Sequence, residues 1–128
     1  MRVYKFGGAS VKDASGVRNL KEIVAQASDD LMVVISAMGK TTNALERVVA
    51  ALAQNDDHTA ETEWLGILDQ HVYIMQDLGL QPNVDVRIPM MPEYNKAWSY
   101  DQNYDQIVSL GEIMSTQIVA VFLLKSGI

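Results

Sequence analysis

The pattern of apolar and polar positions divides the chain into two short strands and several amphipathic helices. Val3–Phe6 and Leu31–Ile35 are apolar runs of strand length, and the second, unbroken run is typical of a parallel strand covered on both faces. Between them, apolar residues recur every three or four positions and predict a helix over Ala14–Ala27, ended by Ser28–Asp30. Strand, helix and strand within about 35 residues form a βαβ unit, so the two strands should pair in parallel.

The rest of the chain predicts three further helices and one irregular segment. Apolar positions at helical spacing cover Leu45–Leu52, Thr59–Leu78 and Asp105–Lys125. Residues 80–104 hold all three prolines and lose the periodicity, apart from a short strand expected at Val84–Ile88. The outline is therefore an α/β chain that is rich in helix and has a small parallel sheet.

Several single residues refine this outline. Ser10 or Asp13 should cap the start of the first helix, because short polar side chains accept hydrogen bonds from the first free backbone N–H groups. Gly79 and Gly127 follow two of the predicted helices, where a left-handed backbone commonly ends a helix. His71 lies on the apolar stripe of its helix, so we expect a core or interface histidine rather than a catalytic one.

Length and composition limit the classes of function. A chain of 128 residues with 48% hydrophobic and 20% charged residues is one globular domain or part of one. Two strands make a poor doubly covered sheet, so residues 1–128 are expected to be the N-terminal portion of a larger domain. The net charge of −6 argues against a nucleic-acid partner, and the absence of cysteine excludes thiolate chemistry and thiolate metal sites. No leader-like run and no segment approaching about 20 apolar residues is evident, so we expect a cytoplasmic protein without a membrane partner.

The first candidate site is the turn that follows the first strand. Lys5 lies in an apolar strand without a charged neighbour, and a lone buried ammonium is costly unless an anion meets it. Gly7 and Gly8 then allow a sharp turn whose N–H groups can surround an anion, and a helix starts shortly afterwards. The alternative is an ordinary tight turn beside a surface lysine. Lysine, glycines and helix start together favour a phosphate-binding turn.

The second candidate site follows the second strand. Gly39-Lys40-Thr41 resembles the end of a P-loop, but Val34 stands where that motif requires a glycine, so we reject a P-loop. Ser36 and Thr42 remain at the carboxyl end of a parallel strand, where α/β sheets bind ligands. The alternative, favoured by pattern alone, is that Thr42 and its neighbour Asn43 only cap the next helix.

The third candidate is Glu112, which lies in the apolar helix next to Gly111. A glycine inside a helix usually marks close approach by another element. If Glu112 faces inward, it needs a cationic partner such as a bound amine or Lys5. If it faces outward, it is an ordinary surface glutamate, and the pattern does not decide between the two.

Together, these three places resemble a known family. The segments Lys5-Phe6-Gly7-Gly8, Val34–Gly39 with Thr42-Asn43, and Ser109-Leu110-Gly111-Glu112 are similar in order and spacing to those of aspartate kinases (aspartokinases). The resemblance implies the amino-acid-kinase fold, an α/β/α sandwich, here truncated to the front half of the kinase domain. It also implies ATP-dependent phosphorylation of the aspartate side chain to 4-phospho-aspartate, the first step toward lysine, threonine and methionine.

The resemblance further implies roles for particular residues. Lys5 would meet the transferred phosphate, and Phe6, Gly7, Gly8 and Ser10 would form the ATP-binding turn. Ser36, Thr42 and Glu112 would bind aspartate, with Glu112 on its α-amino group. The cofactors would be ATP and Mg²⁺, with the Mg²⁺ held by the nucleotide phosphates and no metal ligands from this chain.

The resemblance also leaves open questions. Ala9 stands where the family usually has threonine or serine, so one hydroxyl contact is missing. The segments that hold adenine, a substrate-binding arginine and the regulatory domains lie outside these residues, so the 128-residue chain is expected to be inactive alone and to form a homo-oligomer. Alternatives are another family member, such as a glutamate 5-kinase or a uridylate kinase, or a non-catalytic interaction module with the same fold.

Overall fold

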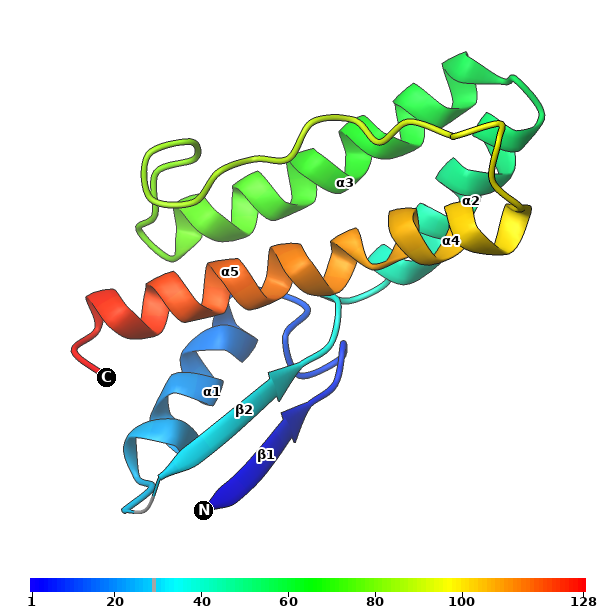
Figure 1. Ribbon diagram of the computed structural model, residues 1–128. Helices are drawn as coiled ribbons and strands as arrows, with labels where there is room; N and C mark the ends of the chain where they lie inside the picture. The colour runs from blue at the N-terminus through cyan, green and yellow to red at the C-terminus, as the bar shows by residue number, and fades with distance from the viewer. Residues whose placement is uncertain (29) are drawn as a thin grey trace.

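Figure 1 shows the computed structural model, which describes residues 1–28 and 30–128. Two strands and five helices follow one another along the chain: β1 (Arg2–Phe6), α1 (Ala14–Ala25), β2 (Leu31–Ile35), α2 (Thr41–Ala53), α3 (Asp57–Asp77), α4 (Tyr100–Val108) and α5 (Leu110–Lys125). The polar break predicted at Ser28–Asp30 includes Asp29, which lies outside the described residues.

The two strands form a parallel pair, as the βαβ spacing predicted. Arg2 is in register with Leu31, and Phe6 is in register with Ile35. One face of this pair packs against helices, but the other face is uncovered, because Val3, Met32 and Val34 are 53%, 50% and 44% exposed. The prediction that β2 is covered on both faces is therefore wrong for this chain, since no described element packs on the second face. Two of the three layers of the expected sandwich are present in the described residues.

The helices enclose two apolar clusters. The first joins α1, β2, the end of α3 and the second half of α5, and includes Leu20, Met38 and Ile118. The second joins α2, α3, α4 and the start of α5, and includes Leu45, Trp64 and Ile107. Because α5 contributes to both clusters, it fixes the strand layer relative to the α2–α4 bundle (Figure 1).

Several helix ends agree with the predictions. Asp13 caps α1 by accepting a hydrogen bond from Gly16 N at 2.8 Å, so Asp13 rather than Ser10 is the N-cap. Gly79 and Gly127 follow α3 and α5 with φ of 79° and 82°, as expected for glycines that end helices.

His71 is buried on α3, as predicted for a core histidine, and its Nδ1 lies 2.7 Å from the Ile67 carbonyl oxygen.

Two predictions between α3 and α5 are wrong. Val84–Ile88 is not a strand, because the Asp85 side chain accepts from Gln81 N at 2.7 Å and holds a tight turn with only one isolated bridge. The last helix is also not continuous from Asp105. A capping box at Ser99 starts α4 earlier, and Ser109 separates α4 from α5. Local side-chain hydrogen bonds of this kind set where the backbone turns and where helices start, and the apolar periodicity used for both predictions does not reveal them.

The helical stretch Tyr100–Lys125 is long and apolar enough to cross a membrane by length and composition alone. The expectation that no segment approaches this limit is therefore wrong. A core helix of a globular domain passes the same test, and Met114, Ile118 and Val119 of this stretch are buried in the two clusters. We interpret the stretch as a core element of the domain.

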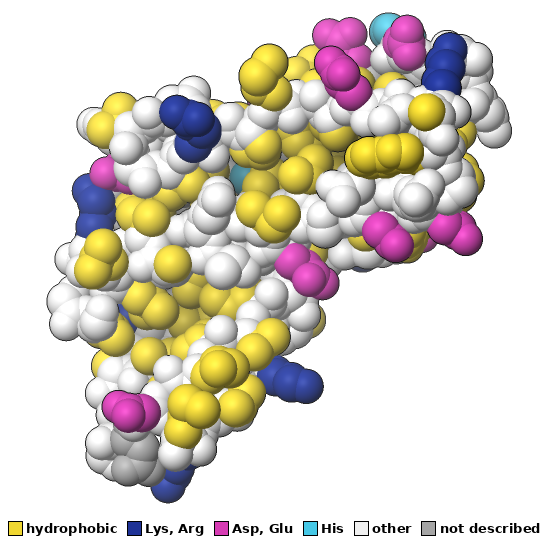
Figure 2. All heavy atoms as spheres, viewed as in Figure 1, with side chains coloured by type: hydrophobic (Ala, Val, Ile, Leu, Met, Phe, Trp, Pro, Cys, Tyr) yellow, Lys and Arg dark blue, Asp and Glu magenta, His cyan; other side chains and the backbone are white. Residues whose placement is uncertain are grey.

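The uncovered strand face continues into a groove beside β2. Figure 2 shows hydrophobic side chains gathered over the strands and lining the hollow between β2 and α5. This groove has a volume of about 590 Å³ and runs along the edge of β2 that faces away from β1.

Candidate functional site

The turns that follow β1 and β2 are joined by their backbones. Gly39 N donates to Gly8 O at 3.0 Å, and a Cβ added at Gly8 would lie 2.9 Å from Ala37 O and 3.0 Å from Gly39 O. Glycine is therefore required at position 8 by packing between the two turns. A Cβ at Gly7 would meet nothing within 4 Å, so no described part of the chain closes over that residue. The glycine pair thus has one structural member and one open member.

The predicted ATP-binding residues lie together at this junction. Ser10 N donates to Gly7 O at 3.0 Å and closes the turn, and the Ser10 side chain is exposed. Phe6 is half-buried against the first apolar cluster, so its ring has a packing role as well. The turn leads into α1 through the Asp13 cap.

Lys5 is in a different environment from the one predicted. It lies on the uncovered face of β1, in register with Val34, and its side chain is exposed. The prediction that the Lys5 ammonium is buried is therefore wrong, because this side chain is exposed to water. Lys5 makes no ion pair with the described residues, so its amine is free to meet an anion beside the glycine turn.

The turn after β2 carries the predicted aspartate-binding residues. Ser36 directly follows β2 and Thr42 lies in the first turn of α2. Lys40 occupies the N-cap position of α2, and its side chain makes no capping hydrogen bond. The alternative that Thr42 and Asn43 cap this helix is therefore wrong. The neighbouring Thr41 instead turns its hydroxyl inward and donates to Met38 O at 2.6 Å.

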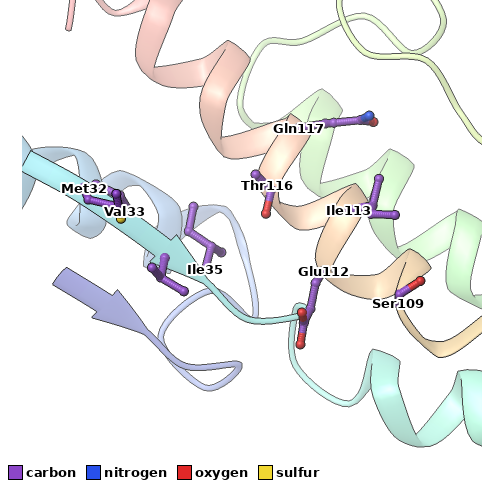
Figure 3. Close-up of a pocket in the computed structure, with 9 residues that line it drawn as sticks. Met32, Val33, Ile35, Ser109, Glu112, Ile113, Thr116 and Gln117 are labelled. Carbon is purple, nitrogen blue, oxygen red and sulfur yellow. The ribbon is translucent and has the colours of Figure 1, made fainter. Parts of the chain in front are cut away.

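The start of α5 packs tightly against this second turn. A Cβ at Gly111 would lie 2.9 Å from Ala37 Cβ and 3.3 Å from Thr41 Cγ2, which confirms the close approach predicted from that glycine. Glu112 is exposed and lines the groove together with Ile35 of β2. Figure 3 shows its carboxylate extending from α5 toward the turn that follows β2. Glu112 thus faces outward, but into a groove at the strand ends rather than into open solvent.

Sequence reasoning missed one polar residue at this junction. Ser115 is fully buried, and its hydroxyl donates to Ser36 O at 2.7 Å. Ser36 N in turn donates to Phe6 O at 3.0 Å. In the sequence, Ser115 lies at helical spacing from Gly111 and Ile118 on the apolar stripe, and this is the signal that could have identified it.

The electrostatics of this edge favour an anion. The contacts of Gly111 with Thr41 and Leu45 place α5 next to the start of α2, whose positive helix end lies at the second turn. Lys5 adds a full positive charge at the first turn. Among residues 1–28 and 30–128, no group of three or more His, Cys, Asp or Glu side chains is arranged to hold a metal ion.

The structure therefore brings Lys5, Gly7, Gly8, Ser10 and Ser36 to one sheet edge, with Glu112 at the rim of the adjoining groove. A parallel βαβ unit whose two following turns meet at one open sheet edge defines an α/β protein of the class that binds ligands at the carboxyl ends of its strands. The chain belongs to the amino acid kinase family, whose family model matches residues 1–128. The expected fold, an α/β fold of the amino-acid-kinase type that is helix-rich with a partial parallel sheet, is confirmed.

Similar proteins carry aspartokinase names. Aspartokinase 1, chloroplastic, from Arabidopsis thaliana is 31% identical over 143 residues, which cover 98% of this chain and 24% of that protein. Aspartokinase from Corynebacterium glutamicum is 47% identical over 53 residues, covering 39% of this chain and 13% of that protein. A crystal structure of Clostridium acetobutylicum aspartate kinase matches with a TM-score of 0.68 and 22% identity, over 97% of this chain and 29% of that one. The chain thus spans about a quarter of the length of the relatives that it matches over nearly its whole length.

Proposed function

We propose that this chain is the N-terminal portion of the catalytic domain of an aspartate kinase, which transfers a phosphoryl group from ATP to the side-chain carboxylate of aspartate. One observation carries the proposal: the glycine turn after β1, which follows the exposed Lys5, is hydrogen-bonded to the turn after β2, next to the groove that Glu112 lines. The aspartokinase names of the relatives support the choice of aspartate as acceptor.

Phosphoryl transfer asks a protein mainly for positioning and for stabilisation of charge, not for a nucleophilic side chain. Lys5 is proposed to stabilise the transferred phosphate, and the open Gly7 with Gly8 and Ser10 to hold the ATP phosphates at the turn. The exposed Lys5 amine and the space over Gly7 fit a phosphate of ATP. Mg²⁺, held by the nucleotide phosphates, would neutralise charge on the reacting oxygens.

The acceptor side of the proposal involves the second turn and α5. Glu112 is proposed to bind the α-ammonium group of aspartate, and its exposure toward the groove gives a small molecule access to it. Ser36 and Thr42 are proposed to contact the same substrate. Both follow β2 at the strand end where α/β sheets bind ligands.

The first alternative is another member of the same family, such as a glutamate 5-kinase or a uridylate kinase. The glutamate in the Ser109–Glu112 segment favours an acceptor with an amino group, and therefore argues against a nucleotide acceptor. The second alternative is a non-catalytic module of the same fold, and an in-frame stop codon directly after Ile128 would favour it.

A panel of acceptors tests the proposal. Coupled ADP release by the full-length protein should require aspartate and should be absent with glutamate or UMP. Trapping the product with hydroxylamine should give aspartyl hydroxamate, because an acyl phosphate reacts with this nucleophile. Turnover with glutamate or UMP but not with aspartate would contradict the proposal.

The surface and the charge of the chain support proposals on its association and location. The uncovered strand face and the open edge of β2 favour association, so we propose that the 128-residue chain forms a homo-oligomer. We also propose a cytoplasmic location, no nucleic-acid partner and no membrane partner, consistent with the acidic net charge and the packing of Tyr100–Lys125.

A further inference from the structure

Two hydrogen bonds link the glycine turn to the helix that carries Glu112. Phe6 O at the end of β1 accepts from Ser36 N at 3.0 Å, and Ser36 O accepts from Ser115 Oγ at 2.7 Å. Ser115 lies on α5 three residues after Glu112. The backbone of Ser36 is therefore held from both sides, by the strand next to the ATP-binding turn and by the helix next to the aspartate-binding groove.

Ser115 is the only side chain of α5 with a described hydrogen bond to the strand layer. The Ser115 hydroxyl has a single hydrogen, and its contact with Ser36 O at 2.7 Å is shorter than its contact with Glu112 O at 3.1 Å within α5. The Ser126 hydroxyl donates to Phe122 O at the end of the helix. Because Ser115 is fully buried, water does not compete for its bond to Ser36. Packing at Gly111 limits how closely α5 approaches the second turn, and Ser115 adds a directional contact that sets the rotation and height of α5 there.

We propose that Ser115 is a positioning residue, which fixes Glu112 relative to Lys5 and the glycine turn through the backbone of Ser36. The proposal rests on the proposed function, because it assigns Ser115 a role in presenting Glu112 to the amino group of the acceptor. Ser115 itself touches no substrate. Its effect should therefore appear in the use of aspartate and not in the use of ATP.

The test compares Michaelis constants in the full-length protein. Ser115→Ala should raise the KM for aspartate about 5-fold to 10-fold, the change expected when one buried hydrogen bond is lost. The KM for ATP should stay within about twofold, because the Gly8–Gly39 junction does not involve Ser115. Alanine is the strongest helix former, so α5 itself should persist in the variant.

Two control variants separate positioning from general loosening of the helix. Ser126→Ala removes a serine hydroxyl that bonds only to Phe122 O near the end of α5, and should leave the KM for aspartate unchanged. Val119→Ala removes buried apolar volume one turn after Ser115, and should lower the melting temperature at least as much as Ser115→Ala does. Its KM for aspartate should stay within about twofold.

The outcomes distinguish this inference from the proposed function. If Glu112→Gln raises the KM for aspartate and Ser115→Ala does not, the positioning role is wrong while the proposed function stands. If Val119→Ala raises that KM as much as Ser115→Ala, the effect is general softening and the positioning role is again wrong. If Glu112→Gln itself leaves aspartate use unchanged, the assignment of Glu112 fails, and the role of Ser115 fails with it.

Discussion

Replacing Gly8 by alanine tests the junction between the two turns. The new Cβ would lie 2.9 Å from Ala37 O and 3.0 Å from Gly39 O, and both atoms belong to the backbone. The turns must therefore separate, which weakens the hydrogen bond from Gly39 N to Gly8 O. Gly7→Ala is the matched control, because a Cβ at that position meets nothing within 4 Å and Gly7 does not have a positive φ.

The expected change in unfolding free energy combines two destabilising effects and one stabilising effect. Overpacking at a close contact costs about 1–3 kcal/mol, and a weakened hydrogen bond costs about 1 kcal/mol. A glycine-to-alanine change also reduces the entropy of the unfolded chain, which stabilises the fold by about 0.4–1 kcal/mol. We expect Gly8→Ala to lose about 2 kcal/mol of unfolding free energy, whereas Gly7→Ala should gain a few tenths of a kcal/mol.

Urea unfolding of the chain, followed by circular dichroism at one fixed protein concentration, measures both values. For a chain of this size, a loss of about 2 kcal/mol should lower the melting temperature by about 5–10 °C. In the full-length protein, Gly7→Ala should still weaken ATP use, because its methyl group occupies the space proposed for a phosphate. Equal stability of the two variants, or a larger loss for Gly7→Ala, would refute the division between a structural and an open glycine.

Three further predictions address other parts of the chain. Gly111→Ala should lose about 1–3 kcal/mol of unfolding free energy, measured by urea unfolding, because its Cβ would meet Ala37 Cβ at 2.9 Å; unchanged stability would contradict the tight packing of α5. Burial lowers the pKa of His71, and the hydrogen bond with Ile67 O offsets only part of this effect. As the pH falls, the unfolded chain therefore takes up a proton at His71 at a higher pH than the folded chain does. The free energy of unfolding should therefore fall as the pH drops below about 6.5, with a slope that His71→Leu reduces; an unchanged slope in His71→Leu would exclude His71 as the cause. The 128-residue chain should sediment as an oligomer at micromolar concentration and lack aspartate-dependent ATP turnover, and a stable monomer or measurable turnover would contradict the respective expectation.

The sequence predicted those features that depend on residues close together in the chain. The bounds of β2, the cap at Asp13 and the helix ends at Gly79 and Gly127 each follow from periodicity or from local hydrogen bonding. The close contact at Gly111 was also predictable, because a glycine inside an apolar helix usually marks the approach of a neighbouring backbone or side chain. These signals were sufficient to identify the βαβ unit and the turns at its strand ends.

Features that depend on distant residues were not predictable in the same way. The exposure of Lys5 depends on which elements cover each face of the sheet, and the strand pattern alone suggested burial on both faces. The direction of Glu112 depends on how α5 lies across β2, which periodicity leaves undecided. The bond from Ser115 to Ser36 joins residues 79 positions apart, so no local pattern indicated its partner.

Lys5→Ala in the full-length protein is the most direct test of the central claim that the turn after β1 is the phosphoryl-transfer site. Lys5 is exposed on its strand and makes no ion pair with described residues, so the variant should keep the melting temperature of the wild-type protein. Aspartate-dependent ADP release should fall about 10²-fold or more, because a positioned cation at a transferred phosphate accounts for several kcal/mol of the barrier. Lys96→Ala, at an exposed lysine between α3 and α4, is the control and should keep full turnover. Near-normal turnover in Lys5→Ala would contradict the account.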